Sequence, residues 1–157
     1  HNDARRQRQM CIRDRVYTTS LIVPKMLKNK WGRIINVTSV SVKEPLNYLV
    51  LSNSIRSAVV AWAKSLSVDV GKDGVTVNSI LTGYFDTERI KDLNKEKSKS
   101  LNISEDEVLE KMKSLVPINR LGKTEEYGYL VSFLSSDKAA YINGASIPID
   151  GGLLKSY

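Results

Sequence analysis

Two stretches decide the fold: Gly-Arg-Ile-Ile-Asn-Val-Thr-Ser at residues 32–39 and Gly-Val-Thr-Val-Asn-Ser-Ile-Leu-Thr-Gly at residues 74–83. Each has a short run rich in β-branched residues, at 33–37 and 75–81, bounded by glycine or a polar turn, which is typical of a buried strand. Between them, apolar residues recur at helical spacing from about Leu49 to Val70. Because parallel strands need such a crossover connection, we expect the two strands to pair in parallel.

Helical and strand signals alternate along the rest of the chain. Helical spacing covers 16–30, and Ser104 with Glu107 forms a capping box before a helix to about 115. Thr124 is predicted to cap another helix, and 146–149 is the last predicted strand. The alternation predicts an α/β fold, with a mainly parallel sheet flanked by helices.

Residues 5–14, Arg-Arg-Gln-Arg-Gln-Met-Cys-Ile-Arg-Asp, are the codon-for-codon translation of a transposon-end oligonucleotide used in sequencing-library preparation. We therefore expect residues 1–15 to be a non-native scar, with the genuine protein starting near Val16. The alternative, a natural basic targeting peptide, lacks an apolar segment. His1 and Cys11 are the only histidine and cysteine, so the expected native part excludes disulfides, Cys/His zinc sites and Ser-His triads.

The charge of the chain is modest and dispersed. Of the net charge of +7, three charges come from residues 1–15, where five arginines face two aspartates. The remainder is interspersed, whereas a nucleic-acid interface would show a clustered basic stripe with aromatics. No apolar run approaches the roughly 20 residues of a membrane span. We expect a cytoplasmic protein with no nucleic-acid or membrane partner, and one core in residues 16–157.

The sequence resembles the classical short-chain dehydrogenase/reductases, and most of all their 3-oxoacyl-carrier-protein reductase-like branch. The resemblance runs from Val16 to Gly152 and rests on five blocks in order: 32–39, 63–67 (Ala-Lys-Ser-Leu-Ser), 74–87, 120–126 (Arg-Leu-Gly-Lys-Thr-Glu-Glu) and 141–152 (Tyr-Ile-Asn-Gly-Ala-Ser-Ile-Pro-Ile-Asp-Gly-Gly). It implies that residues 16–157 are the C-terminal half of a doubly wound, mainly parallel Rossmann-like sheet with flanking helices, in a single domain. The first βαβ unit and its Gly-rich turn would be missing.

The resemblance implies a catalytic serine, tyrosine and lysine. Ser39 falls on the serine position, although a serine at this turn could equally cap backbone groups. The tyrosine and lysine positions fall on Ser52 and Arg56, a departure from the family pattern. Serine has no accessible acid/base pKa near neutrality, and arginine stays charged, so neither relays a proton well. Tyr48, four residues before Ser52, is either a substitute acid or a surface tyrosine, and Tyr84 is a weaker candidate.

The resemblance also implies a bound NAD or NADP, with the preference undetermined. The expected cofactor-binding residues follow the strands: Val37, Arg56, Thr82, Gly83, Phe85 and Thr87. Thr87 has a second interpretation as a helix N-cap with Glu88 in the first turn, and both roles can coexist. No metal site is predicted.

Three function hypotheses remain open. The first is a reductase or dehydrogenase for a carbonyl/alcohol pair, and the substrate could be a 3-oxoacyl thioester. The second is a degenerate family member retained for binding or assembly, and the third, favoured by charge alone, is a nucleic-acid binder. The lysines between 91 and 99 are interpreted as a solvated, mobile face, or alternatively as a site that attracts an acidic acyl carrier. The intact protein is expected to form a homotetramer or homodimer.

Overall fold

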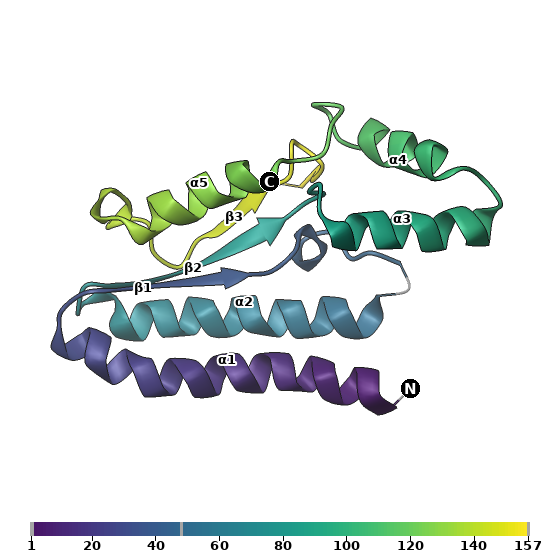
Figure 1. Ribbon diagram of the computed structural model, residues 1–157. Helices are drawn as coiled ribbons and strands as arrows, with labels where there is room; N and C mark the ends of the chain where they lie inside the picture. Colours follow the sequence, from purple (N-terminus) through teal and green to yellow (C-terminus); the bar gives the residue numbers. More distant parts are fainter. Residues whose placement is uncertain (1, 48, 157) are drawn as a thin grey trace.

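A three-stranded sheet lies between two helical layers in the computed structural model, which describes residues 2–47 and 49–156 (Figure 1). Side chains are described from Ile12 onward. The elements, in chain order, are α1 (Asn2–Lys28), β1 (Gly32–Val37), the 3-10 helix η1 (Val40–Val42), α2 (Val50–Gly71), β2 (Val75–Thr82), α3 (Glu88–Leu101), α4 (Glu105–Ser114), α5 (Thr124–Ser135), η2 (Asp137–Ala139) and β3 (Ser146–Ile149).

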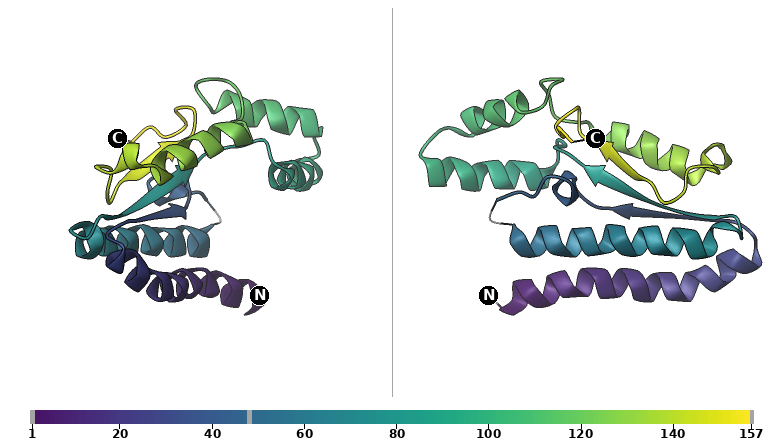
Figure 2. Two further views of the ribbon diagram at one scale, coloured as in Figure 1. Left: turned by 60° about the vertical axis from the view of Figure 1, so that its left-hand side comes forward. Right: turned by 180° about the vertical axis from the view of Figure 1, so that it is seen from behind.

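The sheet is parallel throughout, as predicted, and its strand order is β1-β2-β3. Strand β1 pairs with β2 from Gly32 opposite Val75 to Val37 opposite Ile80. Strand β3 pairs with the second half of β2. Helices α1 and α2 cover one face and α5 the other, while α3 and α4 extend beyond the carboxyl ends of the strands (Figures 1 and 2).

The central strand β2 is buried on both faces, which explains its continuous apolar sequence. Val75 and Val77 pack with Ala63 and Val70 of α2 on one face. On the other face, Ile80 packs with Leu134 of α5 and with Ala139. Successive residues of a strand point to opposite faces, so one strand serves both cores.

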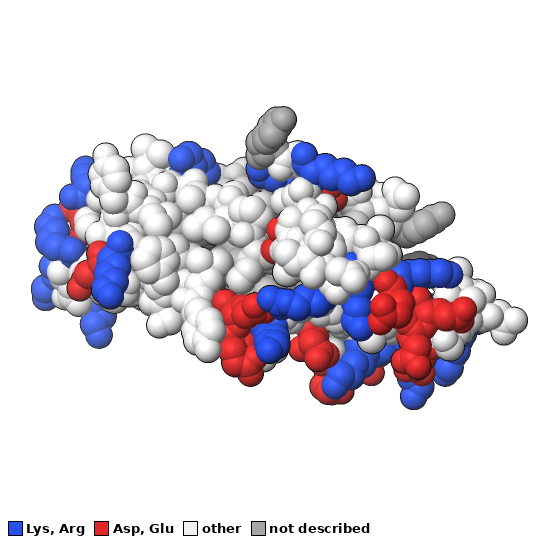
Figure 3. Space-filling model, turned by 90° about the horizontal axis from the view of Figure 1, so that it is seen from above, with Lys and Arg blue, Asp and Glu red and all other residues white. Residues whose placement is uncertain are grey.

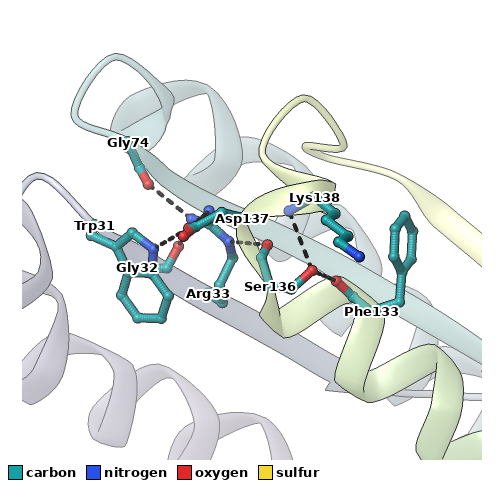
Figure 4. Close-up of polar contacts among 8 residues, drawn as sticks. All are labelled: Trp31, Gly32, Arg33, Gly74, Phe133, Ser136, Asp137 and Lys138. Carbon is teal, nitrogen blue, oxygen red and sulfur yellow. Dashed lines mark hydrogen bonds and ion pairs between the residues drawn. The ribbon is translucent and has the colours of Figure 1, made fainter.

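Arg33 ties the amino end of the sheet to η2 (Figure 4). Its side chain is only 6% exposed and pairs with Asp137 at 3.3 Å. The guanidinium also donates to the carbonyls of Ser136 and Gly74, at 3.3 and 3.1 Å. It lies 4.9 Å from the ring centroid of Trp31, and the indole of Trp31 donates to Asp137 at 2.8 Å. These bonds satisfy a buried cation, so this end of the sheet is a structural junction.

Three local expectations were wrong. The first helix was predicted to start near Val16, but α1 runs from Asn2 to Lys28. That residues 1–15 are non-native stays a prediction, which the helix bounds do not test. Helix α5 is capped at Lys123, and Thr124 is its first residue, because the Glu126 carboxylate accepts from the Lys123 N–H at 2.7 Å. The lysine-rich stretch, for which no helix was predicted, is the regular helix α3; its mobility stays a prediction.

The capping box of α4 is present as predicted. The Ser104 hydroxyl accepts from the Glu107 N–H at 3.1 Å, and the Glu107 carboxylate accepts from the Ser104 N–H at 2.9 Å. The Ser104 N–H, and after it the Ser104 hydroxyl, donate to the Glu107 carboxylate and lower the pKa of Glu107. Helix α4 therefore begins where the sequence placed it.

Candidate active site

The carboxyl ends of the three strands lie at one edge of the sheet, where open α/β folds bind their ligands. The segments that leave this edge are the turn into η1, the turn into α3 and the turn after β3 (Figure 1). The predicted site residues belong to the first two of these segments and to the start of α2.

Ser39 follows Thr38, which links the end of β1 to β2 by hydrogen bonds. Both the N–H and the hydroxyl of buried Thr38 donate to the Ile80 carbonyl at 2.9 Å. The Ser39 hydroxyl then accepts from the Ser41 N–H at 3.2 Å and caps η1. The capping interpretation of Ser39 is thus confirmed. Because a hydroxyl can also donate one bond, the cap leaves the Ser39 hydroxyl able to act as a donor.

Ser52 and Arg56 lie one turn apart on α2, as the helical spacing requires. The Arg56 Nε donates to the Ser52 hydroxyl at 3.3 Å, and both side chains are half-buried. The pair offers an alcohol beside a permanent cation. Tyr48, the proposed substitute acid, lies outside the described residues.

Thr82 ends β2 and contacts a residue that sequence reasoning missed. Its hydroxyl lies 3.1 Å from the hydroxyl of Tyr127, in the first turns of α5. Burial raises the pKa of Tyr127, and the bond to Thr82 acts in the opposite direction. The sequence carries no signal for this pair, because the two residues are 45 positions apart.

Phe85 packs inward. Its ring meets Tyr127 edge-on, with centroids 5.3 Å apart, and its side chain is buried. A Cβ on Gly122 would lie 2.6 Å from the Phe85 ring, so glycine is needed there. The cofactor contact predicted for Phe85 stays a prediction.

Gly83 and Thr87 both have a structural role that explains the residue type at their positions. A Cβ on Gly83 would lie 2.6 Å from the Asp150 Cα, so the turn after β3 packs directly on this glycine. Thr87 caps α3, its hydroxyl accepting from the Ile90 N–H at 3.4 Å. The N-cap interpretation of Thr87 is confirmed. Val37, half exposed at the end of β1, completes the predicted set.

Two hollows open beside Tyr84. The first, of about 160 Å³, is lined by Tyr84, Phe85, Ile118, Arg120, Gly122, Glu126, Ile149, Asp150 and Gly151. The second, of about 190 Å³, lies between α3 and α4 and is lined by Tyr84, Lys97, Leu101, Ile103, Val108, Lys111, Met112 and Leu115. Tyr84 therefore connects the end of β2 with an apolar cleft that carries two lysines.

Arg120 and Glu126 close one side of the first hollow. Two guanidinium nitrogens of Arg120 donate to the two carboxylate oxygens of Glu126, at 2.8 and 2.6 Å. This bidentate bond and the Lys123 N–H hold the pKa of Glu126 at about 2. Over the α3–α4 end of the molecule, acidic and basic side chains alternate without a patch of one sign (Figure 3).

The described residues hold no group of three or more His, Cys, Asp or Glu side chains placed to bind a metal ion. None of the helices in that part of the chain is long and apolar enough to cross a membrane.

Residues 6–154 match a family model described as "Enoyl-(Acyl carrier protein) reductase". The chain belongs to this family of short-chain dehydrogenase/reductases. It is 33% identical over 131 residues to the NADPH-dependent reductase BacG of Bacillus subtilis (strain 168), covering 83% of this chain and 51% of BacG. It is 32% identical over 135 residues to the 3-oxoacyl-[acyl-carrier-protein] reductase FabG of Pseudomonas aeruginosa, covering 83% of this chain and 49% of FabG.

Solved structures of family members share the fold. The NADPH-dependent reductase YwfH, involved in bacilysin biosynthesis, superposes with a TM-score of 0.84 at 29% identity, covering 90% of this chain and 54% of YwfH. The L-sorbose reductase of Gluconobacter frateurii, solved with NADPH and L-sorbose, gives a TM-score of 0.83 at 30% identity, with coverages of 90% and 54%. The family resemblance and the Rossmann-like fold are confirmed. The chain spans about half the length of the curated relatives it matches.

Proposed function

We propose that this chain is the substrate-side part of an NAD(P)-dependent oxidoreductase that acts on a carbonyl/alcohol pair. The observation that carries the proposal is the placement of the Ser39 hydroxyl and the Ser52–Arg56 pair on the segments that follow β1. BacG and YwfH, both matched along this part, are NADPH-dependent reductases by name. The cofactor would supply or accept the hydride, and the chain's own residues would bind, orient and exchange the proton.

The residues fit the nicotinamide end of such a cofactor. Gly83 brings bare backbone to the edge, and Arg56 brings a cation able to bind ribose hydroxyls or a phosphate. Thr82 and Thr87 add hydroxyls, and Val37 and Phe85 add backbone groups. A choice between NAD and NADP does not follow from these residues. We further propose that a cofactor-binding half precedes Val16 in the parent protein, in place of residues 1–15, and sequencing the source DNA across this junction tests that.

Ser39 would donate a hydrogen bond to the substrate oxygen and polarise the carbonyl. Ser52 is a poor acid, since an alcohol does not titrate near neutrality. We propose Tyr48 as the acid, with Arg56 holding the cofactor and with Tyr84 as the weaker substitute. A parent protein in which Tyr48→Phe leaves turnover undiminished would remove Tyr48 from this role.

The proposed substrate class is a small carbonyl compound, with a 3-oxoacyl thioester as the more specific possibility. The α3–α4 cleft supports the latter, because its wall is apolar and Lys97 and Lys111 stand at it. Charge reversal at these lysines should lower turnover of acyl thioesters and spare small ketones. Equal losses on both substrates would contradict the thioester assignment.

The decisive experiment compares the parent protein with its Ser52→Tyr, Arg56→Lys double variant. If the natural pair limits proton transfer, the double variant should turn over a carbonyl panel at least tenfold faster, in keeping with general acid catalysis. No gain in the double variant, with cofactor binding intact, would contradict the assignment of this pair. For residues 1–157 alone we expect weak or absent NADH or NADPH binding, and a micromolar Kd would overturn that.

A second candidate function is a non-catalytic binding or assembly module. The Ser52–Arg56 pair favours it, because neither side chain is a suitable proton relay. Cofactor binding without turnover on the panel would select this candidate.

We also propose that the protein is cytoplasmic and assembles as a homotetramer or homodimer. Large apolar side chains on α1 and α2 are exposed, including Tyr17 (66%), Leu21 (63%) and Val68 (72%). Such exposure marks a surface that a neighbouring segment or subunit covers. Light scattering of the parent protein measures the assembly, and a monomer at micromolar concentration would contradict it.

A further inference from the structure

The segment that follows β3 is fastened to a loop more than one hundred residues earlier in the chain. The backbone N–H groups of Lys155 and Ser156 both donate to the same carboxylate oxygen, Oε1 of Glu44, at 2.8 Å each. Hydrogen bonds to an ionised acceptor are about twice as strong as neutral ones. This contact joins the end of the described chain to the loop between η1 and α2.

The start of this segment is built rigidly. The Asp150 carboxylate accepts from the N–H groups of Gly152 and Leu154, at 2.9 and 2.8 Å. Gly151 and Gly152 both have positive φ, 65° and 86°, a backbone conformation that glycine adopts without a Cβ penalty. A Cβ on Gly151 would also lie 2.7 Å from Val116 Cγ1. The direction of the chain after residue 152 is therefore fixed by local bonds and packing.

The sheet order makes this segment cross the candidate site. It begins at the end of β3 and reaches the loop that follows β1, and β2 lies between these two strands. Neighbouring strands are about 4.8 Å apart, so two spacings are about 10 Å, which the residues between 150 and 155 span easily. The contact of Gly83 with Asp150 shows that the crossing starts directly on the end of β2.

The loop at the other end is also anchored. Glu44 follows η1, and its N–H donates to the Val40 carbonyl at 3.1 Å. Farther along the loop, the Leu46 carbonyl accepts from the side-chain amide of Asn53 on α2, at 2.9 Å. Through these two hydrogen bonds, a displacement of Glu44 would affect both the turn that contains Ser39 and the start of α2, which carries Ser52.

We propose that residues 153–156 are a strap across the carboxyl edge of the sheet and that Glu44 is its latch. The closed strap restrains loop 43–47, and opening it frees the edge of β2 and the loop together. The latch is made mainly by backbone N–H groups, and the Ser156 side chain and the Lys155 charge add smaller contributions. The proposal goes beyond the proposed function and does not depend on it, because the strap is a property of the chain without ligand.

Hydrogen exchange of the full chain, read by mass spectrometry, tests the latch. In Glu44→Ala, we expect exchange at 155 and 156 to become at least tenfold faster, with faster exchange in 40–47. Glu44→Gln keeps an acceptor oxygen without the charge. Its exchange rate at 155 and 156 should lie between those of Glu44→Ala and the unchanged chain. The matched control, Lys155→Ala with Ser156→Ala, keeps both N–H groups and should speed exchange much less than Glu44→Ala does.

Lys155→Pro provides a second route, since it removes one donor and leaves Glu44 in place. It should loosen loop 43–47 in the same way. Unchanged exchange in β2 in every variant shows that the sheet is intact. The proposal is overturned if Glu44→Ala and Lys155→Pro leave 40–47 as protected as before, or if the double alanine control loosens it equally.

Discussion

One substitution, glycine to alanine, should have opposite effects at two positions of this chain. Gly83 lies at the end of β2, where a Cβ would stand 2.6 Å from the Asp150 Cα and 3.3 Å from the Ile149 carbonyl oxygen. Both neighbours are backbone atoms that cannot rotate away. Gly128 lies inside α5, and a Cβ there meets nothing within 4 Å.

The magnitudes follow from these surroundings. Forcing an extra carbon into a packed site costs about 1 to 3 kcal/mol, so Gly83→Ala should lower the free energy of unfolding by that amount. Glycine in a helix interior is about 0.5 to 1 kcal/mol less favourable than alanine. Gly128→Ala should therefore raise the free energy of unfolding by roughly that amount. The difference between the two variants is about 1.5 to 4 kcal/mol.

Urea unfolding followed by circular dichroism measures both values under one condition, from the midpoint and the slope. In thermal unfolding, each kcal/mol corresponds to about 2 to 4 °C in Tm for a domain of this size. Gly83→Ala at or above the stability of the unchanged chain would refute the packing argument at the β2 end. Because the Asp150 carboxylate holds the start of the strap through the Leu154 N–H, Gly83→Ala should also speed exchange at 155 and 156.

Three further predictions concern the core, the half-buried Thr82–Tyr127 hydroxyl pair and the latch. Leu134→Ala removes a side chain that is 1% exposed between α5 and β2, and urea unfolding should show a loss of about 2 to 5 kcal/mol; a loss below 1 kcal/mol would contradict this. Tyr127→Phe removes the bond to Thr82 and should cost about 1 kcal/mol, with Thr82→Val adding little on top of it in a double-mutant cycle; full additivity would show that the pair does not interact. The Lys155 and Ser156 N–H groups lower the pKa of Glu44 from its ordinary value of 4.5, so the latch is complete above pH 4.5 and weakens as the pH falls through the lowered pKa. Exchange at 155 and 156, corrected for its intrinsic pH dependence, should rise there, and a flat profile from pH 6 to pH 3 would exclude Glu44 as the latch.

The sequence carries much of the fold because the signals are local. Glycine before each β-branched run marks β1 and β2, and the helical spacing between them requires parallel pairing. Ser104 and Glu107 mark the start of α4, since a capping box needs residues only three apart. Helix α3 was missed because its surface is almost entirely polar. The Thr87 cap and packing beside α4 stabilise it, and its sequence holds only three apolar residues, Ile90, Leu93 and Leu101.

Only the tertiary structure decided how the site is arranged. The sequence by itself determined the parallel α/β sheet and the family, because these depend on residue type and spacing. It also determined that Ser52 and Arg56 stand where the family pattern has a tyrosine and a lysine. The bond between Thr82 and Tyr127, the inward packing of Phe85 and the latch of Glu44 join residues 37 to 112 positions apart. Such contacts depend on how the strands are ordered and where each turn points, and both are fixed only when the helices pack on the sheet.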